Sequence, residues 1–394
     1  MTSVPSRVLL LILGACTALA LAEALASWVL PSRPCAGRVP FWRPDRTVGW
    51  VLTPGRRGEA SVCGGDQHEV ARHRIEVNDL GQRDRPRHYR RTPGRRRVLV
   101  LGDSFVEALQ VDLEDTFPAR LERTLGVEML NAGVSGYSTD NELRAFLRAG
   151  RRYHPDAVLL LLHVGNDVLE NGALLYLENP HGLPPKPWLR ARAATGTLAT
   201  CLSVHRAIAG IAAGLGPFAW EHSRLIRMGL IGGQAAIVSA LCRRATGPAV
   251  IEGVPELLGV YGEPRTPAWR QAWSETESLL AHLARRVRAT GATFGVALGP
   301  AGFEYDPRLR WYERLEPGTR GRAWDFDYPY RRLGRLLSDQ GIPWTSLVPA
   351  LRAHDDATGD SGTYEWDSHW TAGGHAVVAD ALAPFVAGLL PPGP

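Results

Sequence analysis

Short apolar runs and amphipathic stretches alternate along much of the chain, in two series. In the first series, apolar runs at 98–101 and 157–162, and a second short strand at 127–130 that contains Glu128, each lead into a polar or glycine-bearing loop. Runs that are apolar at every position are typical of strands buried on both faces, as in a parallel sheet. The second series predicts a helix over 269–290, a strand over 293–298, a helix over 329–340, a strand over 343–347 and a helix over 376–390. Repeated strand–loop–helix units predict an α/β fold, namely a three-layer, doubly wound parallel sheet.

One long apolar stretch, Val8–Leu30, has 23 residues and is broken only by Glu23 and small polar residues. A helix of this length spans the roughly 30 Å of hydrocarbon in a bilayer. We favour an uncleaved transmembrane signal anchor. The alternatives are a signal peptide cleaved near residues 20–26, or a lipoprotein signal ending at Cys16, although the apolar run continues beyond this cysteine. Each of the three exports the rest of the chain, which predicts an extracytoplasmic protein, in the periplasm or at the cell surface.

Two further segments lack the pattern of the α/β domain. Residues 31–96 are rich in turns and contain an alternating stretch at 74–78, which predicts an extracytoplasmic preface with short β-structure. Residues 179–264 hold small apolar stretches and predict a helical insertion: a lid, a docking surface for a membrane partner, or a helical pair that only covers the scaffold. The predicted segments are therefore the anchor or signal peptide at 1–30, the preface at 31–96, the insertion at 179–264, and the α/β domain at 97–178 and 265–394.

Charge narrows the class of partner only slightly. The chain has 394 residues with 45 Lys and Arg against 40 Asp and Glu, a net charge of +5. A basic balance suits nucleic acid or an anionic membrane surface, but no nucleic-acid motif accompanies it here. We interpret the excess of arginine mainly as a solvated face, and we expect no nucleic-acid partner.

The cysteines agree with export. Four cysteines lie outside the apolar N-terminal segment, and they allow three pairings. The simplest joins neighbours in the sequence, Cys35 with Cys63 and Cys201 with Cys242; the alternative is four free, buried thiols. No cysteine–histidine cluster has the spacing of a metal site, so neither a metal nor a cofactor is expected.

The loops after the three strands of the first series supply polar groups suited to acyl transfer. Ser104 lies in the tight turn at 102–105, Gly136 in the loop at 131–139 and Asn166 in the loop at 163–167. The carboxyl ends of parallel strands meet at one edge of the sheet, so these groups are expected to lie together. A serine hydroxyl can attack a carbonyl, and two backbone N–H groups with one amide can stabilise the resulting oxyanion. Each residue also has a structural explanation, because serine and asparagine cap helices and glycine occurs in turns.

These three motifs, GDSF, NAGVSGYST and VGND, together with WDSHW near the C-terminus, resemble the blocks of the SGNH, or GDSL-type, hydrolase and esterase family. The Gly-Trp and Asn-Asp-Leu-Gly pieces of the segment at 31–96 resemble the preface of its bacterial membrane-anchored members. The resemblance implies the flavodoxin-like SGNH hydrolase fold. It also implies Ser104 as the nucleophile, His369 as the general base and Asp367 as the acid that orients it. Ser104, Gly136 and Asn166 would then form the oxyanion hole.

Other residues compete for these roles. The family commonly places the acid three positions before the histidine, whereas Asp367 lies two positions before His369, which leaves Glu365 as a distant substitute. His375 is the rival base, although its position at the start of a helix favours a structural role. His163, at the end of a strand, is expected to be packed rather than catalytic.

The sequence and the resemblance together predict an exported, membrane-anchored serine hydrolase that cleaves a carboxylic ester. The expected substrate carries a short acyl or O-acetyl group, with an acylated carbohydrate as one form of it. One alternative is an O-acyltransferase that modifies an extracellular polysaccharide through the same acyl-enzyme. Another is a non-catalytic binding module that has kept the fold.

Overall fold

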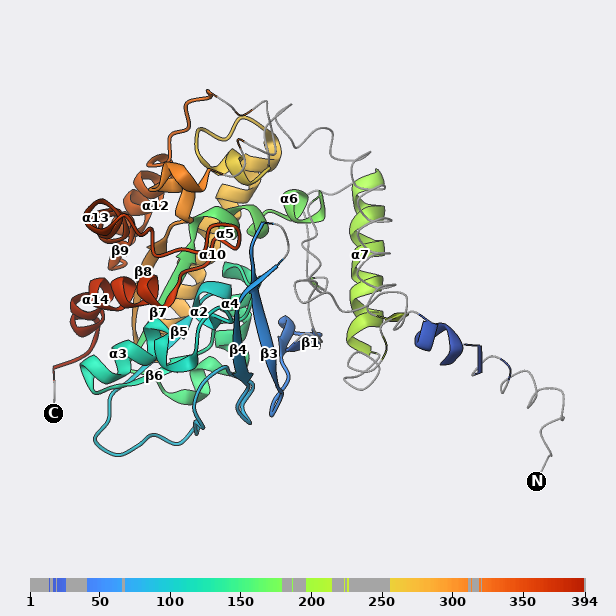
Figure 1. Ribbon diagram of the computed structural model, residues 1–394, viewed down its shortest axis with the longest axis horizontal. Helices are drawn as coiled ribbons and strands as arrows, with labels where there is room; N and C mark the ends of the chain where they lie inside the picture. The colour runs from blue at the N-terminus through green and yellow to red at the C-terminus, as the bar shows by residue number, and fades with distance from the viewer. Residues whose placement is uncertain are drawn as a thin grey trace.

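A computed structural model of the chain describes mainly residues 41–65, 68–178, 196–214, 256–310 and 321–392, with a few shorter pieces between them (Figure 1). Most of the predicted membrane segment at 8–30 and most of the insertion at 179–264 lie outside the described residues.

A five-stranded parallel sheet forms the centre of the molecule. Its strand order is β6-β5-β7-β8-β9, and the strands are β5 (Arg97–Leu101), β6 (Glu128–Asn131), β7 (Ala157–His163), β8 (Thr293–Gly299) and β9 (Trp344–Ser346). Every residue of β5, β6 and β7 is buried, which explains the unbroken apolar runs at 98–101 in β5 and 157–162 in β7. The predicted α/β class with a parallel sheet is confirmed. The chain first adds β6 on one side of β5 and then adds β7, β8 and β9 on its other side. The direction of strand addition therefore switches next to β5, and open α/β sheets place their sites at such a switch point.

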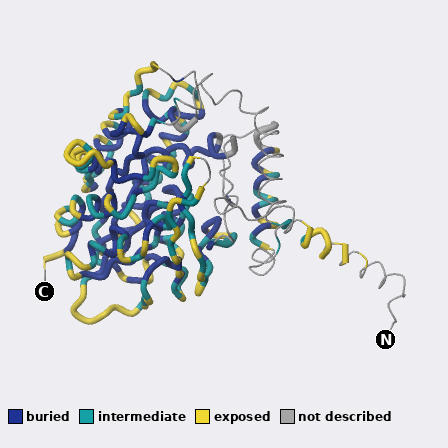
Figure 2. Tube along the Cα trace, in the orientation of Figure 1, coloured by how far each residue is buried: buried dark blue, intermediate teal, exposed yellow. Residues whose placement is uncertain are grey.

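Helices cover the sheet on both faces (Figure 1). On one face α3 (Phe117–Leu125) packs against α14 (Ala372–Leu389), which also contacts α13 (Val348–Thr358). On the other, α10 (Pro267–Arg288) packs against α4 (Thr139–Arg148) and α5 (Val164–Asn171), and its Glu277 pairs with Arg332 of α12 (Tyr328–Asp339) at 2.8 Å. The remaining helices are α2 (Ser104–Glu107), α6 (Ala173–Glu178) and α7 (Gly196–Gly214). Figure 2 shows the buried core running through the sheet between these layers.

Among the described residues, α14 is the one helix long and apolar enough to cross a membrane. It is a core helix instead, because Val378, Leu382 and Val386 on its inner face are inaccessible to solvent. The helix begins at Ala372, four residues earlier than predicted, and so includes His375 in its first turn.

The preface contains two antiparallel hairpins, β1 (Trp42–Asp45) with β2 (Gly49–Leu52), and β3 (Arg57–Cys63) with β4 (Glu69–Glu76). The alternating stretch predicted at 74–78 is the end of β4. A second hydrophobic cluster joins the preface to the α/β domain, since Val48, Trp50 and Ile75 pack there with Val134 and Tyr137. The preface is therefore attached directly to the loop that follows β6.

The disulfide prediction concerns four cysteines, of which the structure describes two. Cys63 and Cys201 are both disulfide-bonded. Cys35 and Cys242, the partners that the prediction gives them, lie outside the described residues. The pairing therefore stays a prediction.

Arg97, the first residue of β5, forms a buried ion pair with the first residue of β6 and also holds the preface. Its guanidinium lies 2.7 Å from Glu128 and also donates to the carbonyls of Tyr89 and Tyr153. Removing one partner of a buried pair leaves the other charge without compensation, so Arg97→Leu is expected to lower the free energy of unfolding by about 3–5 kcal/mol. Urea denaturation measures the loss. The double change Arg97→Leu with Glu128→Leu should recover part of the loss, and an Arg97→Leu variant as stable as the parent would contradict the assignment.

Candidate active site

The turn after β5 exposes a serine at the edge of the sheet. Gly102 has a φ of +157°, which is close to an extended backbone, and a side chain there would collide with Val106. Asp103 caps α2, because its buried carboxylate accepts the N–H of Phe105 at 2.9 Å. Ser104 is the first residue of α2 and stays partly exposed. The motif is therefore a strand-to-helix turn that presents the serine hydroxyl at the carboxyl end of β5.

The structure brings Ser104, His369 and Asp367 into one hydrogen-bonded chain. The Nε2 of His369 lies 2.7 Å from the Oγ of Ser104. The Nδ1 of His369 contacts the Oδ1 of Asp367. A histidine with one nitrogen on a serine hydroxyl and the other on a carboxylate has the arrangement that general-base activation requires.

The backbone explains how an acid two positions before the histidine reaches the ring. Ser368, between them, has a left-handed φ of +65°, which is uncommon for a residue with a side chain. The loop is closed by the N–H of Tyr364 on the carbonyl of His369 and by the N–H of Ser368 on the carbonyl of Tyr364, at 2.9 and 3.0 Å. This sharp turn brings the side chains at positions 367 and 369 together, and Glu365 is not needed.

Charge and burial act against each other on the histidine. Burial lowers the pKa of the His369 imidazole, but the adjacent Asp367 carboxylate outweighs it, so the pKa is raised above its usual value. Burial likewise raises the pKa of Asp367, and the interaction with His369 outweighs that effect and lowers it. The pair therefore favours an imidazolium beside a carboxylate, the state that forms when the histidine takes up a proton.

Asn166 is held in a defined orientation beside the serine turn. Its Nδ2 donates to the Oδ2 of Asp103 at 2.9 Å, and its Oδ1 lies 2.5 Å from the Nδ1 of His163. The ring of His163 stacks on Phe105, with 4.2 Å between ring centroids. One of the two amide hydrogens is used by Asp103, so the second remains available to a developing oxyanion.

Gly136 lies in a tight turn after β6. The N–H of Tyr137 donates to the carbonyl of Val134 at 3.0 Å, and Gly136 has a φ of +75°. This left-handed conformation favours glycine. The structure thus places the loops of Ser104, Gly136 and Asn166 at the same edge of the sheet, as their positions after three parallel strands predict.

The rival base has a structural role. His375 is buried, and its Nδ1 accepts the N–H of Phe117 at 3.3 Å. Burial lowers its pKa to about 3, so it is neutral across the physiological range. It therefore fixes the start of α14 to the start of α3, and the contact with Ser104 is made by His369.

Sequence reasoning missed the groups that support these loops. Asp103 links the serine turn to Asn166, and Glu107 accepts the N–H of Ser135. From the preface, Trp50 donates to the carbonyl of Ser135 at 2.9 Å. Asp103 belongs to the GDSF motif, but no local pattern reveals any of these contacts, because each joins segments far apart in the sequence.

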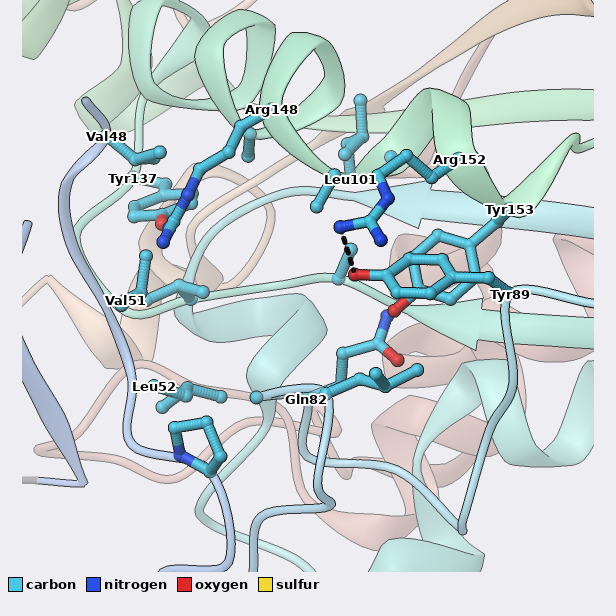
Figure 3. Close-up of a pocket in the computed structure, with 18 of the residues that line it drawn as sticks. Val48, Val51, Leu52, Gln82, Tyr89, Leu101, Tyr137, Arg148, Arg152 and Tyr153 are labelled. Atoms are coloured by element: carbon cyan, nitrogen blue, oxygen red, sulfur yellow. Dashed lines mark hydrogen bonds between the residues drawn. The ribbon is translucent and has the colours of Figure 1, made fainter.

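A cavity of about 200 Å³ lies away from the triad, between the preface and α4 (Figure 3). Val48, Val51 and Leu52 form part of its wall, and Arg148 and Arg152 extend along it. Its lining does not include the serine, the histidine or the asparagine described above. Substrate chemistry is therefore assigned to the exposed edge of the sheet rather than to this cavity.

The raised pKa of His369 predicts the pH dependence. The base must be neutral to accept a proton, so kcat/KM should rise with pH through a midpoint above the ordinary histidine value of about 6.5. Asp367→Asn removes the main negative charge that raises this pKa and leaves the smaller effect of Asp103 to oppose burial, so the midpoint should move to lower pH while the maximal rate falls. Profiles of kcat/KM against pH for both proteins test this, and a midpoint that stays in place would show that Asp367 does not act on His369.

Comparison with known proteins agrees with this geometry. A model of the GDSL-like Lipase/Acylhydrolase family matches residues 100–377. No curated protein matches the chain. Among solved structures, the chain is similar to LAE5, an α/β hydrolase from the metagenome of Lake Arreo in Spain, with 14% identity over 77% of this chain and 99% of that one and a TM-score of 0.38. TesA has 16% identity over 75% of this chain and 100% of that one, with a TM-score of 0.37. The acetyl xylan esterase AlAXEase has 12% identity over 74% of this chain and 99% of that one, with a TM-score of 0.38.

These structural likenesses are too distant to indicate a substrate. The family model covers well over half of the chain. It spans the serine turn, the loops of Gly136 and Asn166, and the turn that carries Asp367 and His369. The chain therefore belongs to the GDSL-like lipase and acylhydrolase family, and it is an SGNH-type esterase.

Proposed function

We propose that this esterase removes a short acyl group, such as acetyl, from an extracytoplasmic ester through an acyl-enzyme on Ser104. The observation that carries the proposal is the 2.7 Å contact between the Oγ of Ser104 and the Nε2 of His369, with Asp367 on the other ring nitrogen. An acylated carbohydrate is one substrate of this class.

In the first half of the reaction, the Oγ of Ser104 attacks the ester carbonyl while His369 takes the hydroxyl proton. The tetrahedral intermediate then collapses. The bond to the leaving alcohol breaks, and His369 returns the proton to that oxygen. Asp367 keeps the imidazole in the required orientation and stabilises its charged form.

The negative charge on the former carbonyl oxygen needs donors that are already in place. We assign this role to the backbone N–H groups of Ser104 and Gly136 and to the amide of Asn166. Among the described residues, neither backbone N–H has an acceptor within the protein. Donors fixed before the reaction stabilise charge without having to reorganise, and each contributes several kcal/mol.

In the second half, water attacks the acyl-Ser104 carbonyl and His369 accepts a proton from it. The acyl carbon forms a bond to the oxygen of water, its bond to the Oγ of Ser104 breaks, and His369 returns the proton to that Oγ, so the products are the free acid and the restored serine. If a sugar hydroxyl takes the place of water, the same acyl-enzyme yields a new ester, which is the O-acyltransferase alternative.

The experiment is a product analysis with the purified domain from residue 31 onward, which keeps Cys35, and with the full chain in detergent. Nitrophenyl esters of increasing acyl length give the chain-length preference, and acetylated xylan with and without added carbohydrate acceptor separates hydrolysis from transfer. Release of free acetate in the absence of acceptor supports the esterase. A rate that depends on the acceptor, with acetylated carbohydrate as the product, would favour the transferase, and no turnover of any ester would favour a binding module.

We also propose that the segment Val8–Leu30 anchors the enzyme in the membrane with the catalytic domain outside the cytoplasm. Support comes from its apolar length and from the disulfide-bonded state of Cys63 and Cys201, since disulfides persist in oxidising compartments. Fusions after Pro40 to reporters active only on one side of the membrane test the topology. Activity confined to the cytoplasmic reporter would overturn this proposal.

A further inference from the structure

The peptide that carries the Gly136 N–H sits at the centre of a turn with two possible orientations. The turn runs from Val134 to Tyr137 and is closed by the 3.0 Å hydrogen bond between them. Among its central residues, only Gly136 has a positive φ, which defines a type II turn. Types I and II differ mainly by a flip of the central peptide, here Ser135–Gly136, and glycine tolerates both. Another contact must therefore select the orientation.

Trp50 of the preface makes that contact. Its indole N–H donates to the carbonyl oxygen of Ser135 at 2.9 Å, and its side chain is completely buried. The carbonyl and the N–H of a trans peptide point in opposite directions. With the Ser135 carbonyl turned to Trp50, the Gly136 N–H points away from the preface.

The other side of the same turn is held from the nucleophile helix. The carboxylate of Glu107, three residues after Ser104, accepts the N–H of Ser135 and is fully buried. Glu107 therefore fixes the Val134–Ser135 peptide, and Trp50 fixes the next peptide, Ser135–Gly136, which is the one that can flip. The first contact sets the distance of the turn from α2, and the second sets which group faces the site.

We propose that Trp50 is a positioning residue of the esterase: its indole N–H selects the orientation of the Ser135–Gly136 peptide that presents the Gly136 N–H to the oxyanion. This inference rests on the proposed role of Gly136. In the flipped orientation the Ser135 carbonyl, an acceptor with a partial negative charge, would take the place of the donor and repel the oxyanion. The preface is then part of the catalytic apparatus and not only a spacer between membrane and enzyme.

The test compares three variants. Trp50→Phe keeps an aromatic ring but removes the indole N–H; we expect kcat for a short acyl ester to fall about tenfold with KM little changed. The rate at which an aryl phosphonate modifies Ser104 should fall in parallel, because its phosphoryl oxygen uses the same donors. Gly136→Ala disfavours the positive φ and should cost more, about 10²–10³ in kcat, the loss typical of one oxyanion donor.

Tyr137→Phe is the matched control. The Tyr137 hydroxyl donates to the main-chain carbonyl of Trp50 at 2.6 Å, so its loss removes a buried hydrogen bond from the same contact between preface and loop. It does not touch the Ser135 carbonyl. For Tyr137→Phe we expect a lower melting temperature and an unchanged kcat. Trp50→Phe should instead have a lower kcat, and the pH midpoint of kcat/KM, which His369 sets, should stay in place.

A crystal structure of Trp50→Phe provides a readout that does not depend on activity, and it should show a population of the flipped Ser135–Gly136 peptide. An unflipped peptide together with parental kcat would overturn the inference, as would equal losses of kcat in Trp50→Phe and Tyr137→Phe. Failure of the proposed function looks different, since the parent would then show no turnover that depends on Ser104.

Discussion

Replacing either Ser104 or His369 with alanine is expected to reduce kcat on a short acyl ester by about 10⁶. Residues of one catalytic unit are strongly non-additive, so the double variant should be little worse than either single variant. The physical reason is the single 2.7 Å hydrogen bond between them, because neither group activates attack without the other. Initial rates for the two single variants and the double variant measure the effect.

His375→Ala serves as the control for this series. The His375 side chain accepts the N–H of Phe117, so its loss should lower the melting temperature and leave most of the turnover intact. An inactive His375→Ala beside an active His369→Ala would show that the base has been assigned to the wrong histidine. Full activity in Ser104→Ala would remove the acyl-enzyme mechanism and favour the binding-module alternative.

Asn166→Ala is expected to lower kcat by about 10²–10³, or roughly 2.7–4 kcal/mol, with little change in KM. The amide is needed mainly when charge develops on the carbonyl oxygen, so the loss appears in the transition state rather than in substrate binding. Asp103 also loses its 2.9 Å hydrogen bond from this amide, which adds a smaller loss of stability. Steady-state kinetics together with thermal unfolding separate the two effects.

The matched control is Asn171→Ala on the same helix. Asn171 is buried; its amide donates to Thr276 at 3.1 Å and accepts the N–H of Asp140 at 3.2 Å, and neither partner belongs to the serine turn. The Asn171→Ala variant should have a lower melting temperature but the same kcat as the parent. Near-parental turnover in Asn166→Ala would instead mean that the amide only orients the loop through Asp103 and His163.

The sheet and the order of its loops were predictable because their signals are local. Strands buried on both faces favour apolar residues at successive positions, as at 98–101 in β5 and 157–162 in β7, and the loops that follow parallel strands share one edge. The motif residues could be placed for the same reason. In each case the structural consequence depends on a few neighbouring residues.

The spacing of the acid and the histidine shows where such reasoning ends. The sequence has Asp367 one position closer to His369 than the family commonly does, and only the left-handed φ of Ser368 explains how the two side chains meet. A serine carries no signal for that conformation. The turn is fixed by hydrogen bonds between Tyr364 and residues 368 and 369, which form only in the folded chain.

Contacts between distant segments were also beyond prediction. Trp50 reaches Ser135 across 85 positions of sequence. From the insertion, Lys186 is completely buried and lies 2.8 Å from Asp140, at the start of α4. A tryptophan in a turn-rich preface and a lysine in a region without periodicity look like surface residues until the fold places them. Both hold the segment that follows β6, which sequence motifs alone describe only as a glycine loop.

An acyl-enzyme on Ser104 can be detected by peptide mass spectrometry of the protein quenched during turnover of nitrophenyl acetate. His369→Ala is measured beside the parent, because an ester formed slowly on the serine should persist when the base that activates water is absent. We expect one acetyl group on the peptide that contains Ser104, and none in Ser104→Ala. Acetylation of another residue, or ester turnover with Ser104 never modified, would contradict this expectation.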